Sequence, residues 1–303
     1  MPGSFPPPCT SRPDYLGNME DVEGLSGVCR KYGCLLLVDN AHGAYLNFLP
    51  ESRHPMALGA DLCCDSAHKT LPVLTGGAYL HISGSAPELF SLAADQAMAL
   101  FASTSPSYLI LQSLDRANEA LSSSWVGSLH RAAGEWEKVK ALLRIFGYSL
   151  AGQEPLKLTI LPKDYGYTGE ELSKILEEQN IFCEFSDPDH LVLMLPVEYD
   201  PGLPSRLTEV FRKIPRRGAI SISAPALQRA EAVLRPHEAL FLPSRLVPVA
   251  EAAGRIMADP TVSCPPAIPV VCSGEQIEAW AVEAMEYYGI TQVRVVATNE
   301  VTQ

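Results

Sequence analysis

The chain has 303 residues, of which 47% are hydrophobic and 19% are charged. This length allows two domains, because single cores rarely grow beyond roughly 250–300 residues, and the composition is too apolar for an intrinsically disordered chain. The formal net charge of −12 disfavours a general binder of nucleic acid or anionic membranes.

The cysteines argue for a reducing environment. None of the eight forms a C-x-x-C pair, and we find no secretory signal peptide, so we expect reduced thiols in a cytoplasmic protein. Cys63 and Cys64 lie in an apolar run, where packing is favoured over metal binding, and we expect no metal. No apolar stretch reaches the ~18 residues of a membrane span.

The first predicted elements alternate in the manner of an open parallel sheet. Residues 1–13 are proline-rich and predict a disordered tail or a broken edge. Residues 18–32 predict a helix that ends at Gly33. Residues 34–38 then predict a buried strand, with Asp39 at its carboxyl end.

A second unit repeats this order. Residues 60–64 predict a strand, which is followed by Asp65–Thr70, and residues 76–82 predict the strand that pairs after it. Ligands of open parallel sheets gather beyond the carboxyl ends of the strands. We therefore expect the functional residues just after these strands.

The rest of the chain predicts long helices and then an α+β domain. Residues 86–101 and 108–146 predict helices, which are interrupted at 103–106 and loosened at 122–127. Residues 156–161, 181–185 and 190–196 predict strands, and Thr168 with Glu171 predicts a capping box that opens a helix to Gln179. Arg212, Lys213, Arg216 and Arg217 predict a solvated helix end rather than a polyanion site.

The final 70 residues predict a helix at 249–258, a turn-rich stretch at 263–269, a helix at 276–288 ended by Gly289, and a strand at 292–297. We predict a disordered tail at 1–13, an α/β domain at 14–148 and an α+β domain at 149–303.

Asp39 and Lys69 suggest the chemistry. An aldehyde cofactor needs a lysine amine, and a pyridine ring that accepts electrons needs a carboxylate to keep its nitrogen protonated. About one strand–helix–strand unit separates the two residues, so both could face one crevice. Taken singly, Asp39 could be a helix cap or a metal carboxylate, Lys69 a surface lysine, and His42 and His68 core or capping histidines.

Several ordered blocks resemble the bacterial Orn/Lys/Arg decarboxylases, which belong to the fold-type I superfamily of pyridoxal-phosphate (PLP) enzymes. The blocks are Pro13–Gly17, Leu37–Gly43, Gly59–Pro72 and Ser103–Tyr108, and Cys264–Pro269 with Gly274–Glu275 is similar to the C-terminal domain of that family. The resemblance implies a partial PLP-dependent transferase-like large domain with a mainly parallel sheet, followed by an α+β C-terminal domain.

The resemblance also implies residue roles. Lys69 would bind PLP covalently and Asp39 would pair with the pyridine nitrogen. The remaining implied contacts are Ala41 on one face of the ring, His42 near the phenolic oxygen, Ser66 on the phosphate, and His68 on the phosphate or the substrate carboxylate. Ser103, Thr104 and Ser105 would approach the phosphate of a neighbouring subunit, although a serine turn before Pro106 explains them equally well.

The implied function is PLP-dependent decarboxylation of arginine, lysine or ornithine to a polyamine-type amine by a homodimer or higher oligomer. Two alternatives stay open. One is another fold-type I reaction, by an aminotransferase or lyase, and the other is a non-catalytic truncated subunit.

Members of the family carry a phosphate-binding loop and a ring-stacking aromatic residue before the block that matches Pro13–Gly17. Neither occurs before Pro13, so the resemblance implies that the N-terminal part of the large domain is missing, which would weaken PLP binding. It also predicts an exposed apolar sheet edge at residues 35–38 and poor solubility.

Overall fold

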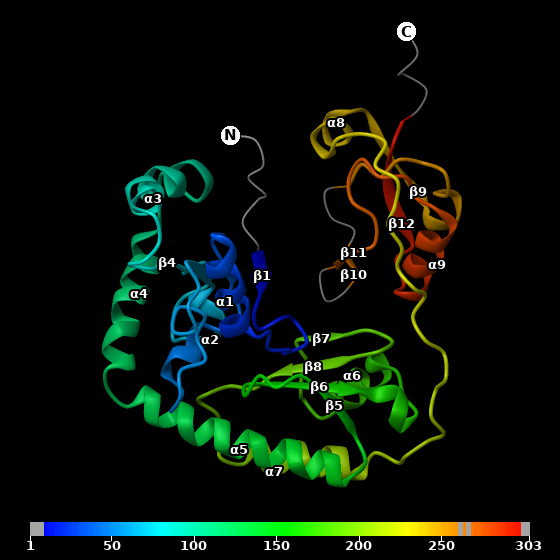
Figure 1. Ribbon diagram of the computed structural model, residues 1–303. Coiled ribbons are helices and arrows are strands. Elements are labelled where there is room, and N and C mark those ends of the chain that lie inside the picture. The colour runs from blue at the N-terminus through cyan, green and yellow to red at the C-terminus, as the bar shows by residue number, and fades with distance from the viewer. Residues whose placement is uncertain (1–8, 260–262, 265–267, 298–303) are drawn as a thin grey trace. The chain divides into compact units, whose positions relative to one another are not determined.

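A computed structural model describes residues 9–259, 263–264 and 268–297 (Figure 1). Contacts divide the chain into two compact units. The first comprises Met1–Phe146, Leu150–Thr159 and Met194–Ile214, and the second comprises Gly147–Ser149, Ile160–Leu193 and Pro215–Gln303. The linear division at 148–149 stays a prediction, because a compact unit is not the same thing as an independently folding domain.

The helices have the following bounds: α1 Val22–Tyr32, α2 Ala67–Thr70, α3 Glu88–Phe101, α4 Tyr108–Leu121, α5 Trp125–Ile145, α6 Gly169–Glu177, α7 Leu203–Lys213, α8 Pro236–Phe241 and α9 Ala279–Tyr287, with short 3-10 helices at η1 Ala44–Phe48, η2 Pro162–Tyr165 and η3 Val249–Glu251.

The strands have the following bounds: β1 Cys9–Ser11, β2 Leu37–Asp39, β3 Leu62–Asp65, β4 Tyr79–Ile82, β5 Ser149–Ala151, β6 Lys157–Leu161, β7 Phe185–Ser186, β8 Leu191–Met194, β9 Ser244–Pro248, β10 Ser263–Cys264, β11 Ile268–Pro269 and β12 Gln292–Val296.

The sheet of the first unit has the order β1-β2-β3-β4. β1, β2 and β3 run parallel, and β4 returns antiparallel to β3. Asp39 pairs with Cys64 in the ladder, so β2 and β3 end side by side. The expected parallel pair, and the pairing of the next strand after it, are confirmed, whereas the antiparallel direction of β4 was not predicted.

The predictions for residues 1–13 and for an exposed edge need correction. Residues 1–8 lie outside the described part of the chain, but Cys9–Ser11 form β1 and pair with Leu37–Asp39. The prolines flank this segment instead of interrupting it, so its backbone can complete a ladder. The edge of β2 that we expected to be exposed is therefore covered.

The helix before β2 is confirmed. Asp21 caps α1 by accepting a hydrogen bond from the Gly24 amide, and Gly33 ends the helix in the left-handed conformation, where glycine avoids the steric penalty of a Cβ. Val22 and Cys29 on its inner face pack with Val38 of β2. This apolar contact fixes α1 against the sheet and sets the direction of the tip of β2.

The long helical region is also confirmed, with a break where the sequence predicted loosening. α4 ends at Leu121 and α5 starts at Trp125. α5 and α7 lie side by side in Figure 1. The fully buried Trp136 of α5 contacts the ring of Tyr199 and donates a hydrogen bond from Nε1 to the Pro196 carbonyl.

A further four-stranded sheet has the order β5-β6-β8-β7. The predicted capping box is present, with Thr168 and Glu171 each accepting from the other's backbone N–H at the start of α6. The strand predicted at 181–185 is wrong in extent, because the ladder contains only Phe185–Ser186, which pair with β8. Ile181 instead directly follows the turn that ends at Asn180, which has a positive φ of 56°.

In the second unit, β9 and β12 pair antiparallel, and Trp280 and Met285 of α9 pack into the same core as Val293 and Val295. The helix predicted at 249–258 is wrong. Only Val249–Glu251 turn, in a 3-10 helix, and Gly254 then takes a positive φ of 78°. Isolated β-bridges at Ile256 and Met257 then hold the backbone extended. These pairings with distant residues override the helical spacing of the apolar residues on which the prediction rested.

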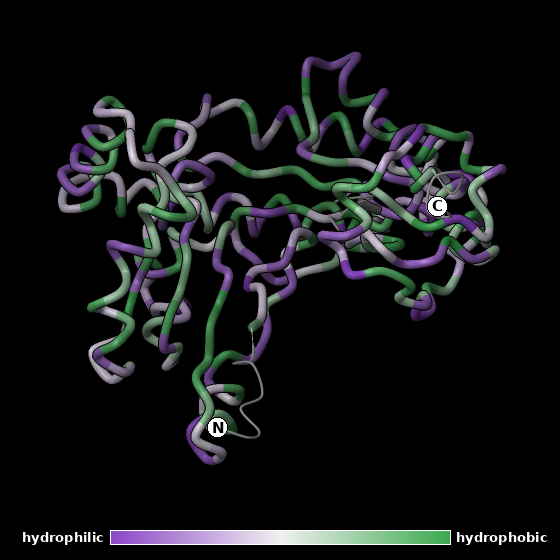
Figure 2. The backbone as a smooth tube through the Cα atoms, turned by 90° about the horizontal axis from the view of Figure 1, so that it is seen from above, coloured by the Kyte–Doolittle hydropathy of each residue, from purple (hydrophilic) through white to green (hydrophobic). Residues whose placement is uncertain are grey.

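Two surface predictions can be compared with the structure. Lys213 and Arg212 at the end of α7 pair with Glu209, and Arg217 pairs with Glu171, in line with a solvated basic cluster. Polar and apolar residues are interspersed along the backbone in Figure 2. Within the described residues, no helix combines the length and hydrophobicity needed to cross a membrane.

Candidate functional site

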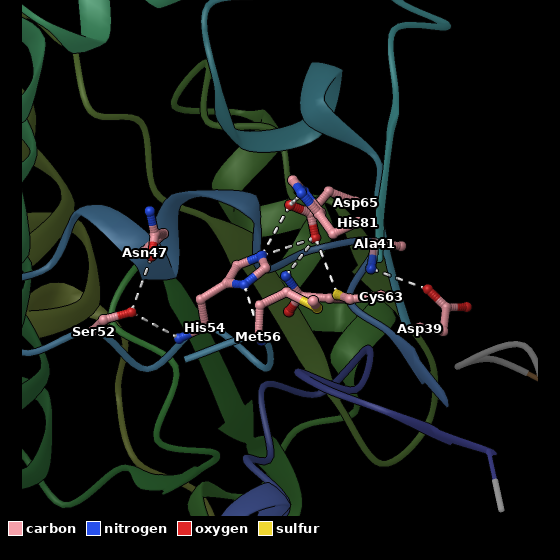
Figure 3. Close-up of polar contacts among 10 residues, drawn as sticks. Asp39, Ala41, Asn47, Ser52, His54, Met56, Cys63, Asp65 and His81 are labelled. Atoms are coloured by element: carbon pink, nitrogen blue, oxygen red, sulfur yellow. Dashed lines mark hydrogen bonds and ion pairs between the residues drawn. The ribbon is translucent and has the colours of Figure 1, made fainter. Parts of the chain in front are cut away.

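The tips of β2 and β3 carry the predicted site residues. Asp39 is the last residue of β2, and Lys69 lies on α2, which follows β3 after a single residue. Both side chains are exposed. The Asp39 carboxylate accepts a hydrogen bond of 3.0 Å from the Ala41 amide (Figure 3). The sequence thus located both residues beyond adjacent parallel strands, as the topology requires.

The structure brings Lys69 and His42 together. Lys69 Nζ lies 3.0 Å from His42 Nε2. Burial, with help from the nearby charges of Lys157 and Lys69, lowers the pKa of His42 to about 3, so the imidazole is neutral at physiological pH. It can then accept a hydrogen bond from the lysine amine, which leaves the proton on Nδ1, a buried atom without a partner among the described residues.

His42 and Lys69 line a cavity of about 240 Å³ that is built entirely from the first unit. The other walls come from α5, from the start of β6 and its preceding loop, and from the end of β8 and the segment after it. The lining comprises His42, Lys69, Thr70, Leu71, Pro72, Trp125, Glu154, Leu156, Lys157 and residues 194–198. Asp39 is not among them, so its convergence with Lys69 on one ligand stays a prediction.

Glu154 is a buried carboxyl group in this wall. It accepts hydrogen bonds from the Tyr45 hydroxyl and from the Leu156 amide at 3.1 Å. Burial raises its pKa, although the hydrogen bond from Tyr45 and the charge of Lys157 oppose that rise. Lys140 donates to the Glu154 and Pro155 carbonyls, which fixes this loop against α5.

The raised pKa of Glu154 predicts a pH dependence of stability. The folded state binds this proton more tightly than the unfolded chain does, so the contribution is complete below the ordinary value of 4.5 and is lost as the pH rises through the folded value. In Glu154→Gln the amide oxygen still accepts from Tyr45 and Leu156. Urea unfolding from pH 4.5 to 8 should show a smaller loss of stability with pH than in the unmodified chain.

The exposed Glu178→Gln variant is the matched control and should follow the unmodified chain. Parallel curves for Glu154→Gln and the unmodified chain would contradict the raised pKa.

A second group of polar side chains comes from β3, β4 and the loop before β3, and was missed by sequence reasoning. Asp65 is buried and accepts hydrogen bonds from His54, from His81 and, at 2.7 Å, from Asn40 (Figure 3). Burial alone would raise the pKa of Asp65, but the hydrogen bonds from both histidines outweigh it and lower the pKa. Asp65 ends β3, so the rule that placed Asp39 at a strand tip could have found it.

The other predicted residues have local roles in the structure. Ser66 precedes α2 but does not cap it through its side chain, and His68 Nδ1 lies 3.0 Å from the Gly77 carbonyl. The Ser105 amide donates to Ser103 Oγ, which is the serine turn that we considered. Ser103, Thr104 and Ser105 are exposed, and their predicted approach to a neighbouring subunit is untested.

Comparison with known sequences identifies two regions. Residues 9–140 match the major domain of Orn/Lys/Arg decarboxylases, and residues 223–294 match the C-terminal domain of the same family. The uncharacterized protein YaaO of Bacillus subtilis is 31% identical over 299 residues, covering 91% of this chain and 60% of that protein. An arginine decarboxylase of B. subtilis is 29% identical over 290 residues, covering 88% of this chain and 58% of that enzyme.

Solved structures show the same fold. The lysine decarboxylase of Francisella novicida superposes with a TM-score of 0.71 at 18% identity, over 95% of this chain and 57% of that one. Lysine decarboxylase A of Pseudomonas aeruginosa gives 0.70 at 15% identity, with the same two coverages. A serine palmitoyltransferase structure with PLP gives 0.55 at 14% identity over 67% of this chain and 53% of that one. The fold is that of the fold-type I PLP enzymes, and the chain spans about 60% of the length of its curated relatives.

Proposed function

We propose that this chain, which belongs to the Orn/Lys/Arg decarboxylase family, serves the PLP-dependent decarboxylation of arginine, lysine or ornithine. The observation that carries the proposal is the 3.0 Å contact between Lys69 and neutral His42 in a cavity beyond the parallel strands. A lysine amine reacts with an aldehyde, and among the described residues we find no carboxylate paired with Lys69, whose Nζ lies against His42 instead.

The residues at these strand tips fit PLP. When bound, PLP supplies an aldehyde that reacts with amines and a pyridine ring that accepts electrons from a breaking bond. Lys69 would supply the amine, and His42 would position it by accepting a hydrogen bond from Nζ, because its neutral Nε2 already faces that atom. Asp39 would hold the proton on the pyridine nitrogen, since its carboxylate is exposed and bonded to the Ala41 amide.

One acidic group in the cavity wall supports a cationic substrate. Glu198 is an exposed carboxylate on this lining, whereas burial raises the pKa of Glu154 and favours its neutral form. The charge of Glu198 would attract an ammonium or guanidinium group.

Self-association is part of the proposal. α3 has no buried residue although it is strongly apolar, and Phe101 at its end is 89% exposed. Large exposed apolar patches mark interaction surfaces, so we propose that a second copy of the chain covers α3 and α4. Sedimentation velocity should show a dimer or higher oligomer, and a stable monomer would contradict this part.

The free thiols among the described residues support a cytoplasmic location.

The test is product analysis. The chain is incubated with PLP and, separately, with arginine, lysine and ornithine, and carbon dioxide and the amine product are measured. Release of both from one substrate supports the decarboxylase, and a keto acid without carbon dioxide would support an aminotransferase instead. If no PLP absorbance band and no product appear while the chain associates with a full-length relative, it is a non-catalytic subunit and the proposed activity fails.

A further inference from the structure

The polar group formed by β3, β4 and the loop before β3 has the composition of a metal site. His54, Asp65 and His81 each offer a ligand atom, and these atoms lie within 4.8 Å of one another. Asp65 Oδ2 lies 3.0 Å from His54 Nε2 and 2.9 Å from His81 Nε2. In a tetrahedral zinc site with bonds of about 2.0–2.1 Å, ligand atoms are roughly 3.4 Å apart, so small shifts suffice to admit an ion.

The surroundings of Asp65 resemble the supporting groups of metal carboxylates. Asn40 donates to Asp65 Oδ1 at 2.7 Å and the Cys63 thiol donates to the same atom at 3.5 Å. These contacts orient the carboxylate so that Oδ2 faces both histidines, and His54 Nε2 also lies 3.2 Å from Oδ1 (Figure 3). Ligating carboxylates are commonly held by such outer hydrogen bonds.

One side of the group is open. A cavity of about 280 Å³ is lined by His54, Asp65 and His81, and its other walls include Tyr79, Asn47 and Asn118. His54 and Asp65 are buried, while the His81 side chain is 37% exposed. An ion would therefore enter past His81 and keep a position for water, as three-ligand zinc sites do.

We propose that His54, Asp65 and His81 bind one zinc ion through two imidazole nitrogens and one carboxylate oxygen. Two imidazoles and a carboxylate suit borderline metals such as zinc better than magnesium or calcium, which prefer oxygen ligands. The site is separate from the proposed PLP chemistry, but Asp65 directly precedes Ser66 and α2, which carries Lys69. An ion there would fix the strand end from which Lys69 extends.

Zinc binding changes one hydrogen bond in a detectable way. The Met56 amide donates to His54 Nδ1 at 3.2 Å, so the neutral ring carries its proton on Nε2. Zinc would bind Nε2 and the single ring proton would move from Nε2 to Nδ1, so Nδ1 would no longer accept from the Met56 amide. The amide resonance of Met56 should therefore shift when zinc is added.

Isothermal titration of the whole chain with zinc chloride should give one site. Asp65→Asn keeps the size and the acceptor oxygen but removes the charge, and His81→Ala leaves the His54–Asp65 contact. Each should weaken zinc binding by at least the 10–100-fold that loss of a supporting hydrogen bond costs. His237→Ala, an exposed histidine on α8, is the matched control and should bind like the unmodified chain.

Cobalt substitution distinguishes metal binding by these three residues from metal binding by cysteine. The Co²⁺ form should show visible bands of a four- or five-coordinate ion without thiolate charge-transfer absorption. Zinc should also raise the melting temperature of the unmodified chain and not that of Asp65→Asn. Strong thiolate absorption, or equal zinc affinity in Asp65→Asn, His81→Ala and the unmodified chain, would overturn the proposal and leave the group as a hydrogen-bonded network.

Discussion

Replacing Lys69 by alanine should abolish the visible absorbance band that PLP gains on reacting with a protein lysine, and with it any decarboxylation. The reason is chemical, because a lysine amine is the side chain that can bind the aldehyde covalently. His42, 3.0 Å away from Nζ, cannot substitute as a neutral imidazole. The measurement is an absorbance titration with PLP, together with carbon dioxide release from the preferred substrate.

Lys69→Arg is the control for charge, since arginine keeps a cation at this position and forms no such bond with the aldehyde. It should behave like Lys69→Ala. Lys174→Ala, which removes a lysine from α6, should keep the full band. If Lys69→Ala retains the band, another lysine binds PLP and our assignment is wrong.

Replacing Trp136 by alanine should lower the free energy of unfolding by about 3–5 kcal/mol, as for other fully buried aromatic residues. Trp136 is fully buried on α5, and it joins that helix to the segment after β8 through Pro196 and Tyr199. The cavity and the unpaired Pro196 carbonyl both contribute to the loss. Urea unfolding followed by far-ultraviolet circular dichroism measures it.

Trp136→Phe provides the comparison, because it keeps an aromatic ring and loses mainly the Nε1 hydrogen bond. It should be less destabilising than alanine. The half-exposed Leu142→Ala on the same helix, where the side chain is 39% exposed, should have a smaller effect than either. A loss below about 1 kcal/mol for Trp136→Ala would show that α5 and the segment after β8 do not depend on this contact, since surface substitutions usually fall within ±0.5 kcal/mol.

Local patterns predicted the elements whose signals lie within a few residues. The Asp21 cap and Gly33 bound α1, and Thr168 with Glu171 starts α6, because these hydrogen bonds join residues three or four positions apart. The helix expected at 249–258 failed because the extended bridges of Ile256 and Met257 have partners about 20 and 38 positions later. No short window of sequence contains such partners.

The features of the candidate site also fall into those that local sequence predicts and those that only the tertiary structure shows. The sequence by itself determined the fold class, the tips of β2 and β3, and the residues Asp39, His42 and Lys69 that follow from them, because parallel strands bring their carboxyl ends together. The tertiary structure alone decided that His42 accepts from Lys69, that Glu154 enters the cavity wall, and that His54 and His81 meet at Asp65. These contacts depend on distances and burial between distant segments, which the order of residues along a chain does not specify.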